Sequence, residues 1–100
     1  MRFGLEKKDL ASIRKVFGRF PAVETVIIFG SRAMGNFKKG SDVDLALMGN
    51  VDPSTLNQVK FILNEDEPLP YFFDVITYNE IDHKELKDHI DQVGKLIYKK

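Results

Sequence analysis

The sequence predicts an α/β (α+β) fold in which a three-stranded mixed sheet is backed by helices. Apolar residues recur at helical spacing in several segments, and short runs rich in β-branched and aromatic residues lie between those segments. The chain has 100 residues, of which 43% are hydrophobic, and this is enough for one modest core. Residues 1–100 are therefore expected to form a single domain.

The first predicted elements are a helix and a strand. The helix runs from about Glu6 to Phe20 and ends at Pro21, whose ring cannot continue it. Its apolar residues have helical spacing: Leu10, Ile13, Phe17 and Phe20. The β-rich run Val23–Phe29 predicts the first strand. A turn or a short helix follows from Ser31 to about Phe37.

A second strand is predicted over residues 42–48, because apolar and polar positions alternate there. Val43, Leu45 and Leu47 form its apolar face. Asp42 and Asp44 lie together on the opposite face. The connection to the first strand is longer than a hairpin and shorter than an ordinary crossover, so strand direction stays open and a mixed sheet is expected.

Two helices and a third strand complete the predicted fold. Asp52 and Pro53 are typical of a helix cap and a first helical position, and the helix they open carries Leu56, Val59 and Leu63. Tyr71–Tyr78 predicts the third strand. Asp82 and Glu85 resemble a capping box at the start of a last helix. The apolar stripe of that helix is Leu86, Ile90, Val93 and Ile97.

Composition narrows the possible partners and location. Fifteen basic and fifteen acidic residues cancel, so no overall field draws the protein to nucleic acid or to an anionic membrane. The chain has no cysteine and therefore no disulfide and no thiolate zinc site. Its first residues lack the apolar run of a signal peptide. We expect a soluble, cytoplasmic protein without direct nucleic-acid or membrane binding.

Residues 30–45 contain the most informative pattern in the chain. Gly30 and Gly35 have no Cβ, so the backbone can turn tightly and bring its N–H groups close to phosphate oxygens. Ser31 and Ser41 add hydroxyl groups, and Arg32 adds positive charge. A turn of this kind, directly after an apolar strand, is typical of a nucleotide-phosphate site.

Three aspartates form a candidate metal site. Asp42 and Asp44 project to one face of the second strand, and Asp74 lies in an otherwise apolar third strand. If the two strands are neighbours, the three carboxylates converge, and a magnesium ion would offset their repulsion. Asp42, Asp44 and Asp74 are therefore the predicted catalytic and metal-binding residues.

The same residues also have less specific interpretations. A glycine-serine turn alone is usually just a turn, and a lone Asp-x-Asp is usually a solvated strand end; their joint occurrence reverses those odds. A Walker-type phosphate loop is excluded because Gly35 is followed by Asn36, not by lysine. His83 and His89, six residues apart, cannot share a metal from one helix face and are interpreted as surface residues.

The pattern resembles the signature of a known superfamily. Gly30-Ser31-Arg32-Ala33-x-Gly35, followed after five residues by Ser41-Asp42-x-Asp44-Leu45, is similar to the signature of the nucleotidyltransferases related to DNA polymerase β. The short chain resembles their minimal branch, the MNT proteins of bacteria and archaea. The resemblance implies a polymerase β-like fold, two Mg²⁺ ions and ATP as the donor substrate.

The resemblance also implies roles and partners. The first two aspartates of the family hold the metals, the turn serine touches the triphosphate, and the third aspartate helps to activate the acceptor hydroxyl; these roles fall on Asp42, Asp44, Ser31 and Asp74. Some MNT antitoxins transfer AMP to a tyrosine of an α-helical HEPN toxin, often encoded by a neighbouring gene. A partner of this type, or a second copy of the chain, is expected to bring the acceptor. The alternative is an antitoxin or regulatory module that binds nucleotide without turnover and inhibits its partner by occlusion.

Overall fold

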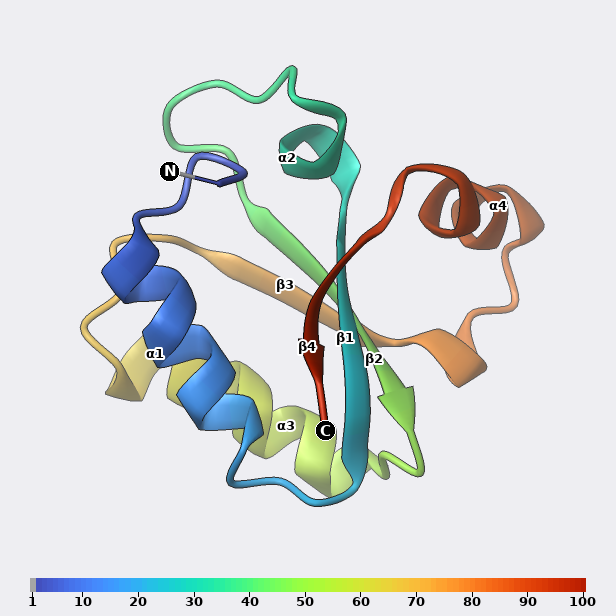
Figure 1. The fold of residues 1–100 in the computed structure, drawn as a ribbon. Coiled ribbons are helices and arrows are strands. Elements are labelled where there is room, and N and C mark those ends of the chain that lie inside the picture. The colour runs from blue at the N-terminus through green and yellow to red at the C-terminus, as the bar shows by residue number, and fades with distance from the viewer. Residues whose placement is uncertain (1) are drawn as a thin grey trace.

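The computed structural model describes residues 2–100, which form four principal helices and one sheet (Figure 1). The elements follow in this order: α1 (Lys7–Phe17), β1 (Val23–Phe29), α2 (Gly30–Met34), β2 (Val43–Gly49), α3 (Pro53–Phe61), the π-helical turn η1 (Ile62–Asp66), β3 (Phe73–Thr77), the 3₁₀ turn η2 (Tyr78–Glu80), α4 (Lys84–Val93) and β4 (Lys95–Lys99).

The sheet has four strands in the order β3-β2-β1-β4, so the prediction of three strands was wrong. Strand β1 pairs antiparallel with β2 and β4, whereas β2 and β3 are parallel. The expectation of a mixed sheet is confirmed. The additional strand comes from residues 95–99, where the apolar spacing predicts a continuation of the last helix through Ile97. Gly94 ends that helix in an extended conformation, and Ile97 is buried as part of β4.

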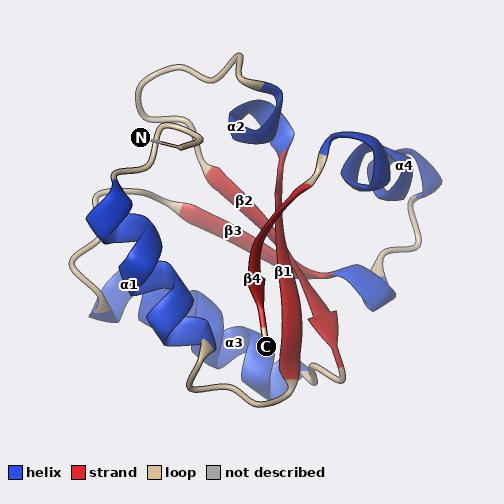
Figure 2. Ribbon diagram, in the orientation of Figure 1, coloured by secondary structure: helices blue, strands red, loops and turns tan. Residues whose placement is uncertain are grey.

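Helices cover the two faces of the sheet unequally (Figure 2). Helices α1 and α3 lie on one face, where they bury the main core. That core includes the predicted apolar face of β2: Val43, Leu45 and Leu47. Helix α4 lies on the other face over a smaller cluster of Phe29, Ala46 and Ile90. Because successive residues of a strand alternate between faces, Asp44 is on the α4 side.

Several predicted boundaries shift for local reasons. Helix α1 ends at Phe17, with Gly18 as its C-cap, rather than at Phe20. The cap predicted for α3 is confirmed, because the Asp52 carboxylate accepts a hydrogen bond from the Thr55 N–H at 2.7 Å. At α4 the predicted cap was wrong: His83, not Asp82, is the N-cap, and its Nδ1 accepts from the Leu86 N–H at 3.3 Å.

Strand β3 is shorter than predicted and is held at its start by a side chain. The Asn64 amide donates to the Phe73 carbonyl at 3.0 Å and accepts from the Phe73 N–H at 2.7 Å, as a neighbouring strand would. This pair anchors β3 one residue before Asp74.

No helix within residues 2–100 combines the length and the apolar character needed to cross a lipid bilayer.

Candidate functional site

The sheet register brings two of the predicted carboxylates side by side. Asp44 of β2 and Asp74 of β3 are direct partners in the parallel pair, so their side chains leave the same face of the sheet. Asp42 lies one residue before β2, two positions from Asp44. Asp42 and Asp74 are exposed, and Asp44 is half-buried between them. Strands β2 and β3 are therefore neighbours, which is the condition on which the predicted convergence of the carboxylates depends.

Electrostatics single out Asp44 within this group. Partial burial, followed by the negative charges of Asp74 and Asp42, raises the pKa of Asp44 from 3.8 to about 6. His89 and Arg32 act in the opposite direction on the same pKa but do not cancel the increase. A carboxylate with crowded negative neighbours and a raised pKa gains from a nearby cation. The donor set thus has the chemistry that a hard divalent ion such as Mg²⁺ requires.

The geometry does not by itself form a complete metal centre. Across residues 2–100, no three His, Cys, Asp or Glu side chains are already arranged as ligands of one ion. Joint binding of a metal by Asp42, Asp44 and Asp74 therefore stays a prediction. The observation in its favour is the mutual effect of these carboxylates on the pKa of Asp44.

The glycine turn directly adjoins Asp44. Phe29, the last residue of β1, is the register partner of Asp44, and Gly30 follows it with φ +72°. A Cβ at Gly30 would overlap the Asp44 carboxylate oxygen Oδ2. Only glycine combines this left-handed backbone with this close approach. The glycine turn therefore adjoins the Asp44 carboxylate, and its role in binding phosphate stays a prediction.

Helix α2 begins at this turn and lies beside α4 (Figure 1). Ser31 is half-buried in its first turn, next to Gly30. Gly35 is the C-cap at the other end of α2, with φ +84° and open space where a Cβ would stand. Gly35 thus ends the helix, whereas Gly30 contacts the carboxylate.

Arg32 has a structural place that the sequence did not reveal. The residue is only 4% exposed. The guanidinium donates to the Ser41 carbonyl from Nε at 3.2 Å and from Nη2 at 2.8 Å, and to the Phe3 carbonyl from Nη1 at 2.9 Å. The rings of Phe37 and Tyr71 lie 5.1 Å and 5.4 Å from its central carbon. Arg32 therefore ties the loop before Asp42 to the N-terminal segment.

His89 is a site residue that sequence reasoning missed. The prediction of a surface histidine was wrong here, because the residue is half-buried and its Nε2 accepts a hydrogen bond from the Gly30 N–H at 3.1 Å. Its ring meets Phe29 edge-on, with 6.1 Å between ring centres. The two linked residues are 59 positions apart, so no local pattern could have paired them. His83, by contrast, is exposed.

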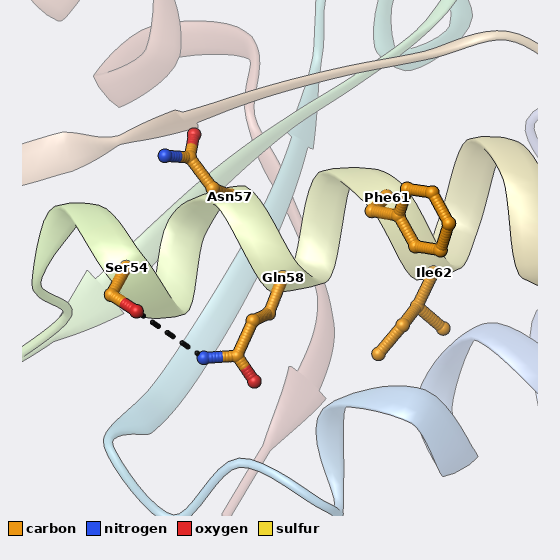
Figure 3. Close-up of a pocket in the computed structure, with 5 residues that line it drawn as sticks. All are labelled: Ser54, Asn57, Gln58, Phe61 and Ile62. Carbon is orange, nitrogen blue, oxygen red and sulfur yellow. Dashed lines mark hydrogen bonds between the residues drawn. The ribbon is translucent and has the colours of Figure 1, made fainter.

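The larger surface hollows do not coincide with the carboxylates. One hollow of about 610 Å³ lies on the outer side of α3 and is lined by Ser54, Asn57, Gln58, Phe61 and Ile62 (Figure 3). It contains no ionisable side chain, and α3 covers the face of the sheet opposite Asp44. A second hollow, of about 450 Å³, is closer to the site. Its lining includes Ser41, which directly precedes Asp42, and Phe72, which lies two residues before Asp74. Neither hollow is lined by Asp42, Asp44 or Asp74.

Comparison with known proteins places the chain. Residues 11–100 match the family described as "Polymerase beta, Nucleotidyltransferase". The chain belongs to this family. No curated protein matches it significantly. The family assignment agrees with the glycine-serine turn and the Asp-x-Asp pair, which lie within the matched residues.

Solved structures show the same fold. A toxin–antitoxin complex with AMP-PNP superposes with a TM-score of 0.73 at 17% identity, over 96% of this chain and 75% of that chain. The MntA–HepT toxin–antitoxin gives 0.71 at 16% identity, over 95% and 74%. A tri-AMPylated HEPN toxin of Shewanella oneidensis in complex with its MNT antitoxin gives 0.70 at 16% identity, over 96% and 74%. The predicted resemblance to minimal nucleotidyltransferases is confirmed.

Proposed function

We propose that this nucleotidyltransferase uses Mg²⁺ to transfer AMP from ATP to a tyrosine hydroxyl of a HEPN-type partner protein, and thereby acts as an antitoxin. The observation that carries the proposal is that Asp44 lies directly against Gly30 and pairs in register with Asp74. Support for the partner and the donor comes from the solved relatives, which include a complex with AMP-PNP and an AMPylated HEPN toxin with its antitoxin.

The carboxylates divide the work by position. Asp42 and Asp44 would hold Mg²⁺, which neutralises negative charge on a bound triphosphate. Asp44 is the more buried of the two, and without a cation its raised pKa leaves it about half protonated near pH 6. Cation binding and proton binding therefore compete at Asp44. At limiting Mg²⁺, transfer should weaken as the pH falls through about 6, because the protonated carboxyl no longer attracts the cation. Saturating Mg²⁺ should move this loss to lower pH.

Asp74 is suited to the acceptor side of the reaction. It is exposed on β3, an edge strand of the sheet, so a hydroxyl from another protein can approach it. Its carboxylate would accept the tyrosine proton as the phenolic oxygen bonds to the α-phosphorus. The bond from that phosphorus to the bridging oxygen breaks, and pyrophosphate leaves. The products are an AMP-tyrosine ester and pyrophosphate.

The turn and the loop would bind the nucleotide, directly and indirectly. Gly30 and Ser31 begin α2 beside Asp44, where they would meet the phosphates. Gly35 would contribute by closing α2 tightly. The Arg32 guanidinium donates hydrogen bonds to the Ser41 carbonyl, so these two residues would act together by fixing the loop that leads to Asp42.

A transfer assay tests the proposal. Wild type, Asp44→Asn and Asp74→Asn are each incubated with the HEPN partner and ATP labelled in the α-phosphate. Asp52→Asn is the matched control, because Asp52 caps α3 and lies outside the site. We expect label on the partner with wild type and the control, removal of that signal by EDTA, and little or no signal with the other two variants.

A second experiment, which measures neutralisation of the partner in cells, separates the proposal from inhibition by occlusion. In cells, the Asp42→Asn/Asp44→Asn double variant should still form the complex but fail to neutralise the partner. Neutralisation by that variant would show that binding alone suffices. Full transfer by Asp44→Asn would refute the role of the carboxylates.

A further inference from the structure

The imidazole of His89 completes the end of a helix that has no local cap. The residue before α2, Phe29, offers no capping side chain. The N–H of Gly30, the first residue of α2, instead donates to His89 Nε2 at 3.1 Å. This long-range bond satisfies an amide that would otherwise have no acceptor within the helix.

The bond defines the state and orientation of the ring. A neutral imidazole accepts through only one nitrogen, so in the neutral ring the bond to Nε2 places the proton on Nδ1. The positively charged ring, which is the form that lowers the pKa of Asp44, has no acceptor to offer the Gly30 N–H. The ring also packs edge-on against Phe29 at an interplanar angle of 79°. Phe29 is buried and pairs in register with Asp44. The imidazole is therefore held on a rigid part of the site.

The Gly30 peptide is confined from two directions. On one side, the position of its missing Cβ is taken by the Asp44 carboxylate. On another, its N–H is held by His89 on α4. A glycine at φ +72° has many alternative conformations when such restraints are lost. His89 is therefore placed to fix the conformation of the turn that carries Ser31.

We infer that His89 is a positioning residue for nucleotide binding, which acts by fixing the Gly30 peptide and, through it, the Ser31 end of α2. This inference rests on the proposed function, since it specifies how the same site is pre-organised. It assigns His89 no direct contact with the nucleotide and no proton transfer. The affinity for nucleotide should therefore depend on His89 more than the rate of the chemical step does.

The experiment compares three variants with wild type. His89→Ala removes the acceptor, whereas His89→Gln retains an amide oxygen that can accept the same bond. His83→Ala is the matched control, because His83 caps α4 without contacting Gly30. Binding of AMP-PNP with Mg²⁺ is measured by calorimetry without a protein acceptor, and KM for ATP and kcat are measured with the HEPN partner.

We expect His89→Ala to weaken AMP-PNP binding about fivefold, the effect of one hydrogen bond worth about 1 kcal/mol. KM for ATP should rise by a similar factor, with a smaller change in kcat. His89→Gln should stay within about twofold of wild type. His83→Ala should lower the melting temperature but leave the affinity unchanged. Unchanged or tighter binding by His89→Ala, or equal weakening by His83→Ala, would overturn the inference.

A nucleotide-free measurement separates this inference from the proposed function. The Gly30 amide proton should shift and exchange faster in His89→Ala than in His83→Ala, as read by NMR. If wild type binds AMP-PNP but transfers nothing, the proposed function fails while the affinity series still judges the role of His89. If the Gly30 amide is unaffected in His89→Ala, the inference fails even when transfer is intact.

Discussion

Replacing Asp44 with asparagine should stabilise the protein without metal and abolish its response to Mg²⁺. The pKa of Asp44 is raised in the folded state, so folding favours its protonated form. The associated stabilisation is present at low pH and is lost as the pH rises from about 4 through about 6. Above that pH the folded state holds a carboxylate that burial and the charges of Asp74 and Asp42 make unfavourable. Asparagine removes the charge with almost no change in shape.

The size of the effect follows from the two pKa values. The difference between 3.8 and about 6 corresponds to about 3 kcal/mol at about 1.36 kcal/mol for each pKa unit. Asp44 is only half-buried, and water screens its neighbours, so a gain of about 1 kcal/mol is the reasonable expectation. For a domain of this length, such a gain raises the melting temperature by about 4–8 °C.

Thermal melts at pH 4 and pH 8, with EDTA or with Mg²⁺, measure this effect. We expect Asp44→Asn to melt above wild type at pH 8 in EDTA and close to it at pH 4. Mg²⁺ should raise the melting temperature of wild type but not of the variant. Asp52→Asn is the control, because a hydrogen bond from the Thr55 N–H lowers the pKa of Asp52, and its replacement should not stabilise the fold. An Asp44→Asn protein that melts below wild type at pH 8 in EDTA would refute the argument.

Three further predictions concern the neighbours of Asp44. Gly30→Ala should reduce nucleotide affinity more than tenfold in calorimetry, because the added Cβ overlaps the Asp44 carboxylate. Gly35→Ala should have a smaller effect, since its Cβ has open space and costs only backbone strain of about 1 kcal/mol. Equal losses of affinity in the two variants would contradict this prediction. Arg32→Lys should lower stability to urea by about 1–3 kcal/mol, since lysine cannot reproduce the forked contacts to two carbonyls; an unchanged midpoint would refute that role. Asp74→Asn should keep the free energy of unfolding within about 0.5 kcal/mol of wild type, because Asp74 is exposed. Its transfer rate should fall far more than its affinity for ATP. Full transfer activity would remove Asp74 from the site.

The error at the C-terminus has a specific cause in the periodicity. Val93 and Ile97 are four residues apart, which fits an α-helix and also fits one face of a strand. Gly94, between them, ends α4, and Ile97 is buried beside β1. The apolar spacing of α4 therefore extends by chance into β4. Only the pairing of residues 95–99 with β1 distinguishes the strand from a longer helix.

Arg32 shows a similar limit for side chains. A cation beside two glycines suggests an anion site, because sequence records its charge but not its direction. In the fold, the Ser41 and Phe3 carbonyls lie within its reach and the side chain is buried. These acceptors are provided by segments that meet only when the chain has folded.

The sequence by itself determined the parts of this protein that depend on local order. Strand alternation placed Asp42 and Asp44 on one face, and the Gly30-Ser31 turn indicated a phosphate site near them. Both patterns depend on residues only a few positions apart in the chain. The tertiary structure alone decided that Asp74 lies beside Asp44 and that His89 holds the Gly30 amide. Those contacts join segments 30 and 59 residues apart, and their geometry is set by how β3 and α4 pack on the sheet, which no local pattern encodes.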